Sequence, residues 1–445
     1  MKTKQRSMTQ GNIWKEIILF SIPLLIGNLF QQLYNTVDSL VVGNYVGENA
    51  LAAVGASNPL SGLIIGFFMG ISAGAGILVS RYFGGKKEKD LNETIHTFIM
   101  LSLITGVVLT FVGLFMSPIL LRWLGTPTEI FNEASVYLKI YFMGVLGLVI
   151  YNAGSGILSA VGDSKNPLIY LIIASIINVV LDLVFVIVFK MGIEGVAYAT
   201  LIAQATSAIL VIRHLLKIDD LYKVQLKHLR INLEKLSEIV RLGIPTAIQS
   251  TVVSFSNVIV QSYINGFGAS AVAGFTAADK FNAIMGLPTN TFSLTITTFT
   301  GQNLGAGRKD RVKEGIKATM VMTIVILILL GIPTYLAAPQ LISIFSKEVN
   351  VINYGVRMLR IMLPFYPILA ITFILSGALR GSGSTLVPMI IMVFSFTVLR
   401  QIFLFIMMKL HYSIDWIYFS YSVTWFESAL LSLLYYRYTD WLSKA

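Results

Sequence analysis

Cysteine is absent from the 445-residue chain, and charged residues are scarce. Without cysteine the chain has no disulfide framework and no thiolate chemistry. Asp, Glu, Lys and Arg make up 12% of the residues, about half the fraction of a soluble domain, whereas 55% of the residues are hydrophobic. The sequence also has no H-E-x-x-H string and no P-loop, so neither that zinc-protease motif nor transport driven by ATP is indicated. The composition indicates a membrane protein.

Long apolar runs recur along the whole chain. A membrane-spanning helix needs about 20 mostly apolar residues. The first run is too long for the core of a signal peptide, so we expect it to be a retained helix. The predicted fold class is therefore all-α integral membrane, with twelve transmembrane helices at 16–42, 51–79, 94–118, 133–159, 166–189, 192–213, 237–263, 270–299, 316–338, 352–378, 385–409 and 413–436.

The net charge of +11 lies in short loops between the apolar runs. Lys2, Lys4 and Arg6 precede the first run, and further basic clusters follow the second, sixth and eighth runs. Such clusters mark the cytoplasmic side of a membrane protein. The pattern predicts a multi-pass protein of the cell (inner or plasma) membrane with both termini in the cytoplasm, and it argues against nucleic acid as a partner.

The two halves of the chain repeat each other. A constant offset of 221 residues relates 155–158 to 376–379, Pro167 to Pro388, and Gly47 to Gly268. The charged stretch after the sixth run separates the halves, which predicts an N-lobe at 1–215, a cytoplasmic linker at 216–236 and a C-lobe at 237–445. Because each half has six spans, the halves share one topology and should be related by a pseudo-twofold axis along the membrane normal, as in known transporters.

Several polar residues inside the spans of the first half have apolar counterparts in the second half. These pairs are Asp182 with Phe403, Asn178 with Leu399, Asn152 with Phe373, and Asp38 with Ile259 or Val260. Asn178 and Asp182 are four residues apart and share a helix face. Counting inward from the predicted helix ends places Asp38, Asp182 and Thr200 at a depth where they could meet.

Carboxylates inside a membrane are costly, by about 2.5–3.5 kcal/mol each on insertion scales. Two neighbouring carboxylates cannot both stay charged unless a proton or a cation compensates them. The residues therefore predict a site for H⁺ or Na⁺, with Na⁺ held by Asp38, Asn178, Asp182 and Thr200. The alternative is a structural role, in which Asp182 pairs with a neighbouring amide and Asn152 bridges helices.

Several motifs follow one another in a set order along the chain: LYNTVD at 33–38, NVVLD at 178–182, GVAYAT at 195–200, GQNLG at 301–305 and GALRG at 377–381. With them the chain resembles the multidrug and toxic compound extrusion (MATE) family, especially its bacterial DNA-damage-inducible-F-like branch. The resemblance implies a V-shaped pair of six-helix lobes around a central cavity, and antiport of organic, often cationic or amphipathic, compounds against H⁺ or Na⁺.

The resemblance also assigns roles to residues. It implies an N-lobe cation site at Asp38, Asn178, Asp182 and Thr200, with Asn152 on the fourth helix, and a bend of the first helix at Pro23. Some relatives use acidic residues of the seventh and tenth helices for the coupling ion. Here the seventh helix offers Gln249 and Asn257, and the tenth helix has no acid around 364–376. Coupling should therefore run through the N-lobe.

We accordingly expect a secondary active multidrug efflux transporter that works by alternating access. It should not be an enzyme, should need no cofactor besides the coupling ion, and should act as a monomer on small molecules in the lipid bilayer. Arg400 lies inside a span and should either pair or extend to the interface. Candidate residues for the substrate cavity, each more often ordinary packing, are Gln31, Tyr34, Asn35, Phe67, Met69, Phe255, Asn257 and Met285.

Three other functions are compatible with a membrane protein of this composition. A lipid or lipid-linked precursor flippase of the same superfamily has the same fold, and a strongly charged cavity would favour it. An intramembrane hydrolase is disfavoured, because the G-x-S-x-G string at 70–74 lies within a span and small-residue packing explains it better. A receptor or channel is disfavoured because no selectivity filter is found and the duplication favours a transporter.

Overall fold

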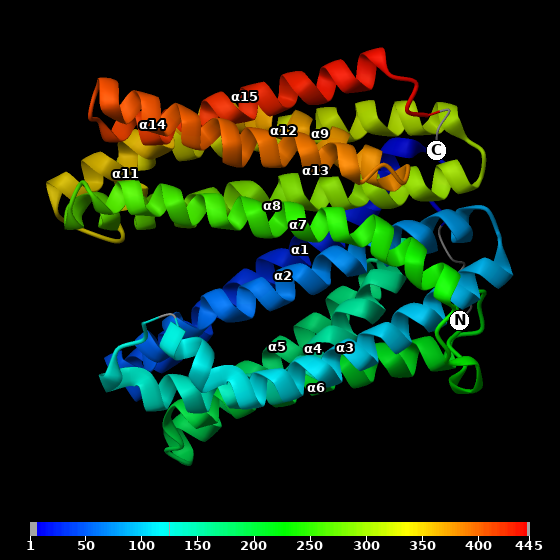
Figure 1. The fold of residues 1–445 in the computed structure, drawn as a ribbon, viewed down its shortest axis with the longest axis horizontal. Coiled ribbons are helices and arrows are strands. Elements are labelled where there is room, and N and C mark those ends of the chain that lie inside the picture. The colour runs from blue at the N-terminus through cyan, green and yellow to red at the C-terminus, as the bar shows by residue number, and fades with distance from the viewer. Residues whose placement is uncertain (1–6, 124, 443–445) are drawn as a thin grey trace. The chain divides into compact units, whose positions relative to one another are not determined.

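The computed structural model describes residues 7–123 and 125–442, and within them the regular elements are all helices (Figure 1). The first basic cluster predicted from the sequence, with Lys2, Lys4 and Arg6, lies outside the described residues. The elements are α1 (Ile13–Val41), η1 (Val42–Val46), α2 (Glu48–Gly84), α3 (Glu88–Trp123), α4 (Thr128–Ala160), α5 (Lys165–Leu183), η2 (Val184–Val188), α6 (Gly192–Lys217), η3 (Leu226–His228), α7 (Leu233–Asn265), α8 (Ala269–Gly305), α9 (Lys309–Leu336), α10 (Ala338–Ser343), α11 (Val349–Met362), η4 (Leu363–Phe365), α12 (Tyr366–Gly381), α13 (Leu386–Val393), η5 (Phe394–Leu399), α14 (Arg400–Leu410) and α15 (Ile414–Tyr438).

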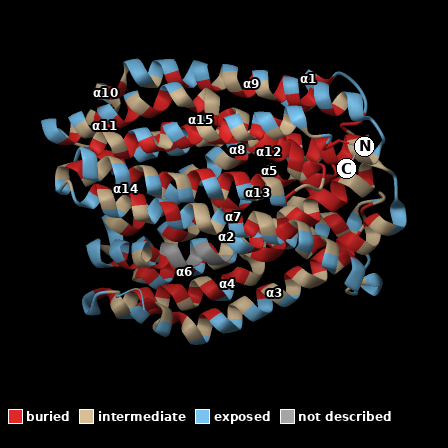
Figure 2. Ribbon diagram, turned by 45° about the horizontal axis from the view of Figure 1, so that its top comes forward, coloured by how far each residue is buried: buried red, intermediate tan, exposed pale blue. Residues whose placement is uncertain are grey.

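Ten helical segments of the described chain are long and apolar enough to cross a membrane. α8 and α15 are also long, but they contain more Thr, Asn, Ser and Tyr. Together these segments correspond to the twelve spans predicted from the sequence, and the all-α membrane fold is confirmed. Large apolar side chains point outward from the helices, among them Phe111 and Phe115 on α3, which are 57% and 75% exposed. In Figure 2 buried and exposed residues alternate along the long helices, as expected for helices with one face toward lipid.

The chain divides into two compact units. The N-unit contains Ile22–Ala247, and the C-unit contains Met8–Ser21 with Ile248–Ala445. α1 therefore begins in the C-unit and continues in the N-unit, while α7 begins in the N-unit and continues in the C-unit. Each change of unit lies close to a helix proline, Pro23 in α1 and Pro245 in α7. The lobe and linker boundaries given above stay a prediction.

A basic side chain holds the residues just before α1, and another holds the start of α7. Within the C-unit, Arg311 donates to the carbonyl of Gly11 at 3.0 Å and to that of Met8 at 3.3 Å. Within the N-unit, Lys235 is almost fully buried and lies 2.8 Å from Asp90 and 3.1 Å from the Tyr82 hydroxyl. These contacts anchor the start of each helix to the unit in which it begins.

The backbone repeats between the halves as the sequence predicts. α2 and α8 are both 37 residues long. Positive φ angles recur at the 221-residue offset in three pairs: Gly47 (123°) with Gly268 (90°), Lys86 (53°) with Gly307 (71°), and Gly162 (96°) with Gly383 (91°). Since left-handed backbone is rare outside such turns, the two halves make the same turns in the same places.

The glycines of the G-x-S-x-G string pack α2 against α7. A Cβ at Gly74 would lie 2.5 Å from the Ile239 carbonyl oxygen and 2.6 Å from the Gly243 nitrogen, and Gly70 is similarly crowded by the backbone of Ala247. Ser72 is buried in the same helix. This close approach of backbones is how small residues join membrane helices, so packing accounts for the string.

Gly74 and Gly76 offer a matched test of this packing. We expect Gly74→Ala to destabilise the protein, because backbone atoms of α7 occupy the place of the new methyl group. Gly76→Ala should be neutral or stabilise by about 0.5–1 kcal/mol, because nothing lies within 4 Å of its Cβ position and alanine favours a helix. Melting temperatures in detergent measure both. Equal melting temperatures for the two variants would contradict the proposed helix contact.

Candidate cation site

Asp38 and Asp182 occupy similar places in two helices of the N-unit. Asp38 lies three residues before the end of α1, and Asp182 lies one residue before the end of α5. A π-helical segment follows each of them, η1 after α1 and η2 after α5. Such wide turns are rare in helices and frequent at functional sites, and they mark both carboxyl groups as part of one site.

The structure brings together four of the five residues predicted to hold the coupling ion. The carboxyl groups of Asp38 and Asp182 lie near enough to influence each other's ionisation. The Asn178 amide nitrogen donates to the Thr200 hydroxyl at 3.5 Å, and Asp182 and Asn178 are 0% and 1% exposed. α1, α5 and α6 therefore each contribute oxygen atoms to one buried cluster.

Four buried oxygen atoms of this cluster have no hydrogen-bond donor among the described residues: Asp38 Oδ1, Asn178 Oδ1, Asp182 Oδ1 and Asp182 Oδ2. Buried acceptors without partners are costly and rare in folded proteins. Two carboxyl groups, an amide oxygen and a hydroxyl are hard ligands that suit a proton or a hard cation. The described residues form no group of three or more His, Cys, Asp or Glu that could hold a metal ion.

Tyrosines surround the two carboxyl groups. Tyr34 on α1 and Tyr137 on α4 both lie within electrostatic range of Asp38 and Asp182. The ring of Tyr141 stacks near that of Tyr137, with centroids 6.3 Å apart. The sequence predicts Tyr34 for the substrate cavity, whereas Tyr137 and Tyr141 are not among the predicted residues. Their spacing of four residues on one face of the weakly apolar fourth span was the available signal.

Asn152 makes a different contact. Its amide donates to the carbonyl of Leu148 in its own helix at 2.8 Å, and no described hydrogen bond joins it to the four site residues. α1 continues through Pro23 as one helix. The roles of Asn152 and Pro23 stay predictions.

The residues predicted to line a substrate cavity differ in exposure. Phe67, Met69 and Phe255 are 48%, 47% and 62% exposed, whereas Met285 is 2% exposed and packs in the apolar core of the C-unit. Gln31 and Asn35 lie on the exposed side of α1. Their part in binding a substrate also stays a prediction.

The C-unit has a buried cation at the place that repeats the acidic site. Arg400, next to the repeat partner of Asn178, is 2% exposed, and its Nη1 donates to Asn257 Oδ1 at 2.9 Å. Its guanidinium lies 4.4 Å from the ring centroid of Tyr421, the residue offset by 221 from Thr200. Among the described residues Arg400 makes no ion pair, and its Nε has no acceptor. Arg400 therefore stays buried, held by a hydrogen bond to Asn257 and by the ring of Tyr421, and does not extend to the interface.

Repeated six-helix units with a buried acidic cluster are typical of a secondary transporter, and comparison with known proteins agrees. The family model MatE matches the chain twice, at residues 23–184 and 245–406, once in each half. The probable multidrug resistance protein YpnP of Bacillus subtilis is 30% identical over 440 residues, which cover 98% of each chain. The probable multidrug resistance protein YoeA of the same organism is 30% identical over 410 residues, covering 89% of this chain and 88% of that protein.

A solved structure described as "Crystal structure of MATE in the straight conformation" is 25% identical, covers 100% of both chains and has a TM-score of 0.93. The chain belongs to the MatE family. It is a polytopic membrane transporter, and the family resemblance and the internal duplication inferred from the sequence are confirmed.

Ion binding at this site can be measured without transport. In purified protein at alkaline pH, we expect added Na⁺ or a lower pH to stabilise the wild type by about 2 kcal/mol at saturation, because the bound cation offsets two buried carboxylates. Asp182→Asn should melt higher than the wild type in Na⁺-free alkaline buffer and lose the response. Glu129→Gln, which changes an exposed acid at the start of α4, is the control and should keep the response. A full response in Asp182→Asn would contradict the site.

Proposed function

We propose that this protein is a secondary active multidrug efflux transporter that exports organic, often cationic or amphipathic, compounds in antiport with H⁺ or Na⁺. The observation that carries the proposal is the buried cluster in which Asp38 and Asp182 face each other beside oxygen atoms without donors. The substrate class is supported by two relatives of nearly full length that are named probable multidrug resistance proteins.

The cluster gives a physical reason for coupling between ion binding and the conformation of the protein. With no cation bound, two buried carboxylates repel each other and lack donors; with a proton or Na⁺ bound, they can approach. A ligand shifts a conformational equilibrium only by its different affinity for the two states. Binding at Asp38 and Asp182 therefore favours the state in which α1 and α5 lie close together at this end, and release favours the state in which they separate.

The repeat-related places of the two units carry opposite charges, and this supports coupling of the ion through the N-unit alone. A cation entering the repeat-related place in the C-unit would meet the buried guanidinium of Arg400, which would repel it. The N-unit place has the opposite charge. In this proposal the N-unit changes its packing with ion binding, and the two halves then expose the substrate site alternately to the two sides of the membrane, with both termini in the cytoplasm.

Efflux from proteoliposomes tests the proposal. With a fluorescent organic cation inside, an inwardly directed gradient of H⁺ or of Na⁺ should drive efflux by the wild type. Asp38→Asn should reduce gradient-driven efflux at least tenfold, because it removes one of the two charges that bind the ion. Asp219→Asn, which changes an exposed acid after α6, should transport at the wild-type rate.

The outcomes separate the possible functions. Efflux driven by one gradient and lost in Asp38→Asn identifies the antiporter and its ion. Wild-type efflux in Asp38→Asn would remove the coupling role of this residue. If no gradient drives efflux of any organic cation, a flippase of the same superfamily becomes the better account, and scrambling of labelled lipids would then be measured.

A further inference from the structure

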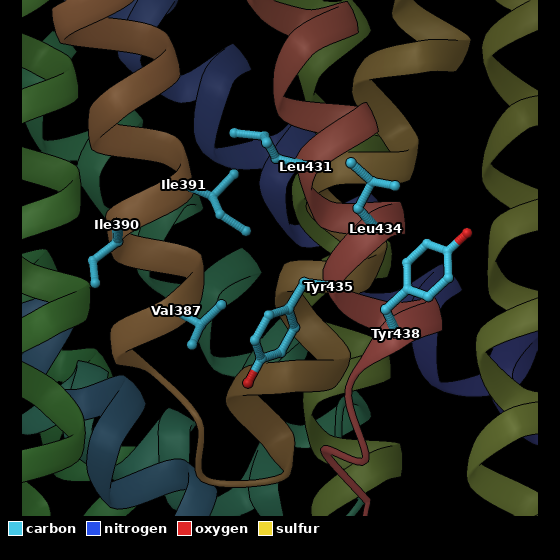
Figure 3. Close-up of a pocket in the computed structure, with 7 residues that line it drawn as sticks. All are labelled: Val387, Ile390, Ile391, Leu431, Leu434, Tyr435 and Tyr438. Carbon is cyan, nitrogen blue, oxygen red and sulfur yellow. The ribbon is translucent and has the colours of Figure 1, made fainter.

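The surfaces of the two units each carry an apolar groove. The N-unit groove lies between α3, α4 and α6 and has a volume of about 590 Å³. The C-unit groove lies between α13 and α15 and has a volume of about 550 Å³. In Figure 3 Val387 and Ile391 of α13 point toward Tyr435 of α15 across the C-unit groove. Both volumes are in the range of pockets that hold an organic ligand, about 300–1,000 Å³.

Charge distinguishes the two grooves. The lining of the N-unit groove includes Arg213 and Lys217, whereas no charged residue lines the C-unit groove. Arg213 and Lys217 are four residues apart in the last turns of α6, so they lie on one helix face. Both are exposed, and among the described residues neither takes part in an ion pair. Two uncompensated positive charges therefore lie at one end of an apolar channel.

Small residues form part of the lining of the N-unit groove. On α6 Ala205 and Ala208 line it, and on α4 Gly144 and Gly147 do so. A Cβ at Gly147 would lie 3.1 Å from the Ala205 nitrogen, so α4 and α6 approach closely here. Met143 and Ile209, which are 47% and 66% exposed, line the same groove. The result is a concave apolar surface on three helices that are each able to span a membrane.

We propose that this groove is a binding site for an anionic phospholipid, with an acyl chain along Ala205 and Ala208 and the phosphate between Arg213 and Lys217. An anionic head and an apolar tail match the two ends of the groove. Basic residues between membrane helices attract anionic headgroups in this way. An organic cation would be repelled by the two bases, and a soluble peptide could not reach an apolar surface that faces the hydrocarbon.

Lipid titration of the delipidated full-length protein in detergent tests the site, with native mass spectrometry counting bound lipids. Phosphatidylglycerol should bind more tightly than phosphatidylcholine with the same acyl chains. The double variant Arg213→Gln with Lys217→Gln should bind phosphatidylglycerol about tenfold or more weakly, because each base near a headgroup contributes a factor of about five. Its binding of phosphatidylcholine should fall less, because the choline cation offsets the charge of the same phosphate.

Two further variants complete the test. Lys87→Gln with Lys89→Gln removes the same charge from two exposed lysines near the start of α3, and it should bind phosphatidylglycerol as the wild type does. Ala208→Trp fills the floor of the groove and should weaken binding of both lipids; its elution as a single monodisperse species reports that it is folded.

Three results would overturn the proposal. The first is unchanged phosphatidylglycerol binding in the Arg213 and Lys217 double variant. The second is an equal loss in the Lys87 and Lys89 variant, which would mean a general attraction to positive charge. The third is competition by inorganic phosphate as effective as that by phosphatidylglycerol, which would mean a site for a free anion without a role for the acyl chain.

Discussion

The burial of two carboxyl groups side by side is the constraint on which the rest of the N-unit depends. Asp38 and Asp182 come from different helices, and Asp182 is fully buried while Asp38 is partly buried, so their charge must be offset by a ligand or by protonation. The surrounding residues supply only part of the compensation that these two carboxyl groups need. Asn178 turns its amide nitrogen toward Thr200, and four acceptor atoms of the cluster have no donor within the part of the chain that the structure describes.

The duplication shows which features serve the fold and which serve the site. The left-handed turns at Gly47 and Gly268 recur in both halves because both halves need the same helix connections. The charges do not recur. Where the N-unit has carboxyl groups, the C-unit has Arg400 held by Asn257 and Tyr421. A guanidinium is covalently part of the chain and keeps its charge, so the C-unit has a fixed cation at the place where the N-unit has carboxyl groups.

Much of this arrangement could be predicted from the sequence, because hydrophobic length and the 221-residue offset act over the whole chain. The spans, the repeat and the gathering of Asp38, Asn178, Asp182 and Thr200 followed from spacing and depth alone. Tyr137 and Tyr141 could not be found this way, since tyrosine is common in apolar spans and its spacing also suits ordinary packing. The burial of Arg400 depends on Asn257, a residue 143 positions away, and no local pattern reports such a contact.

The start of α1 belongs to the C-unit and the rest of the helix belongs to the N-unit. This division bears on how ion binding at Asp38 could change the conformation of the helix. The residues just before this helix are held in the C-unit by Arg311, and the helix then carries Asp38 into the acidic cluster of the N-unit. A helix is stiff along its hydrogen-bonded length, so a displacement of Asp38 relative to the C-unit must be absorbed between these two points. Pro23 lies in that interval and lacks the backbone donor that would close one of its turns. The bend is therefore expected at Pro23, because the rest of the helix keeps its hydrogen bonds.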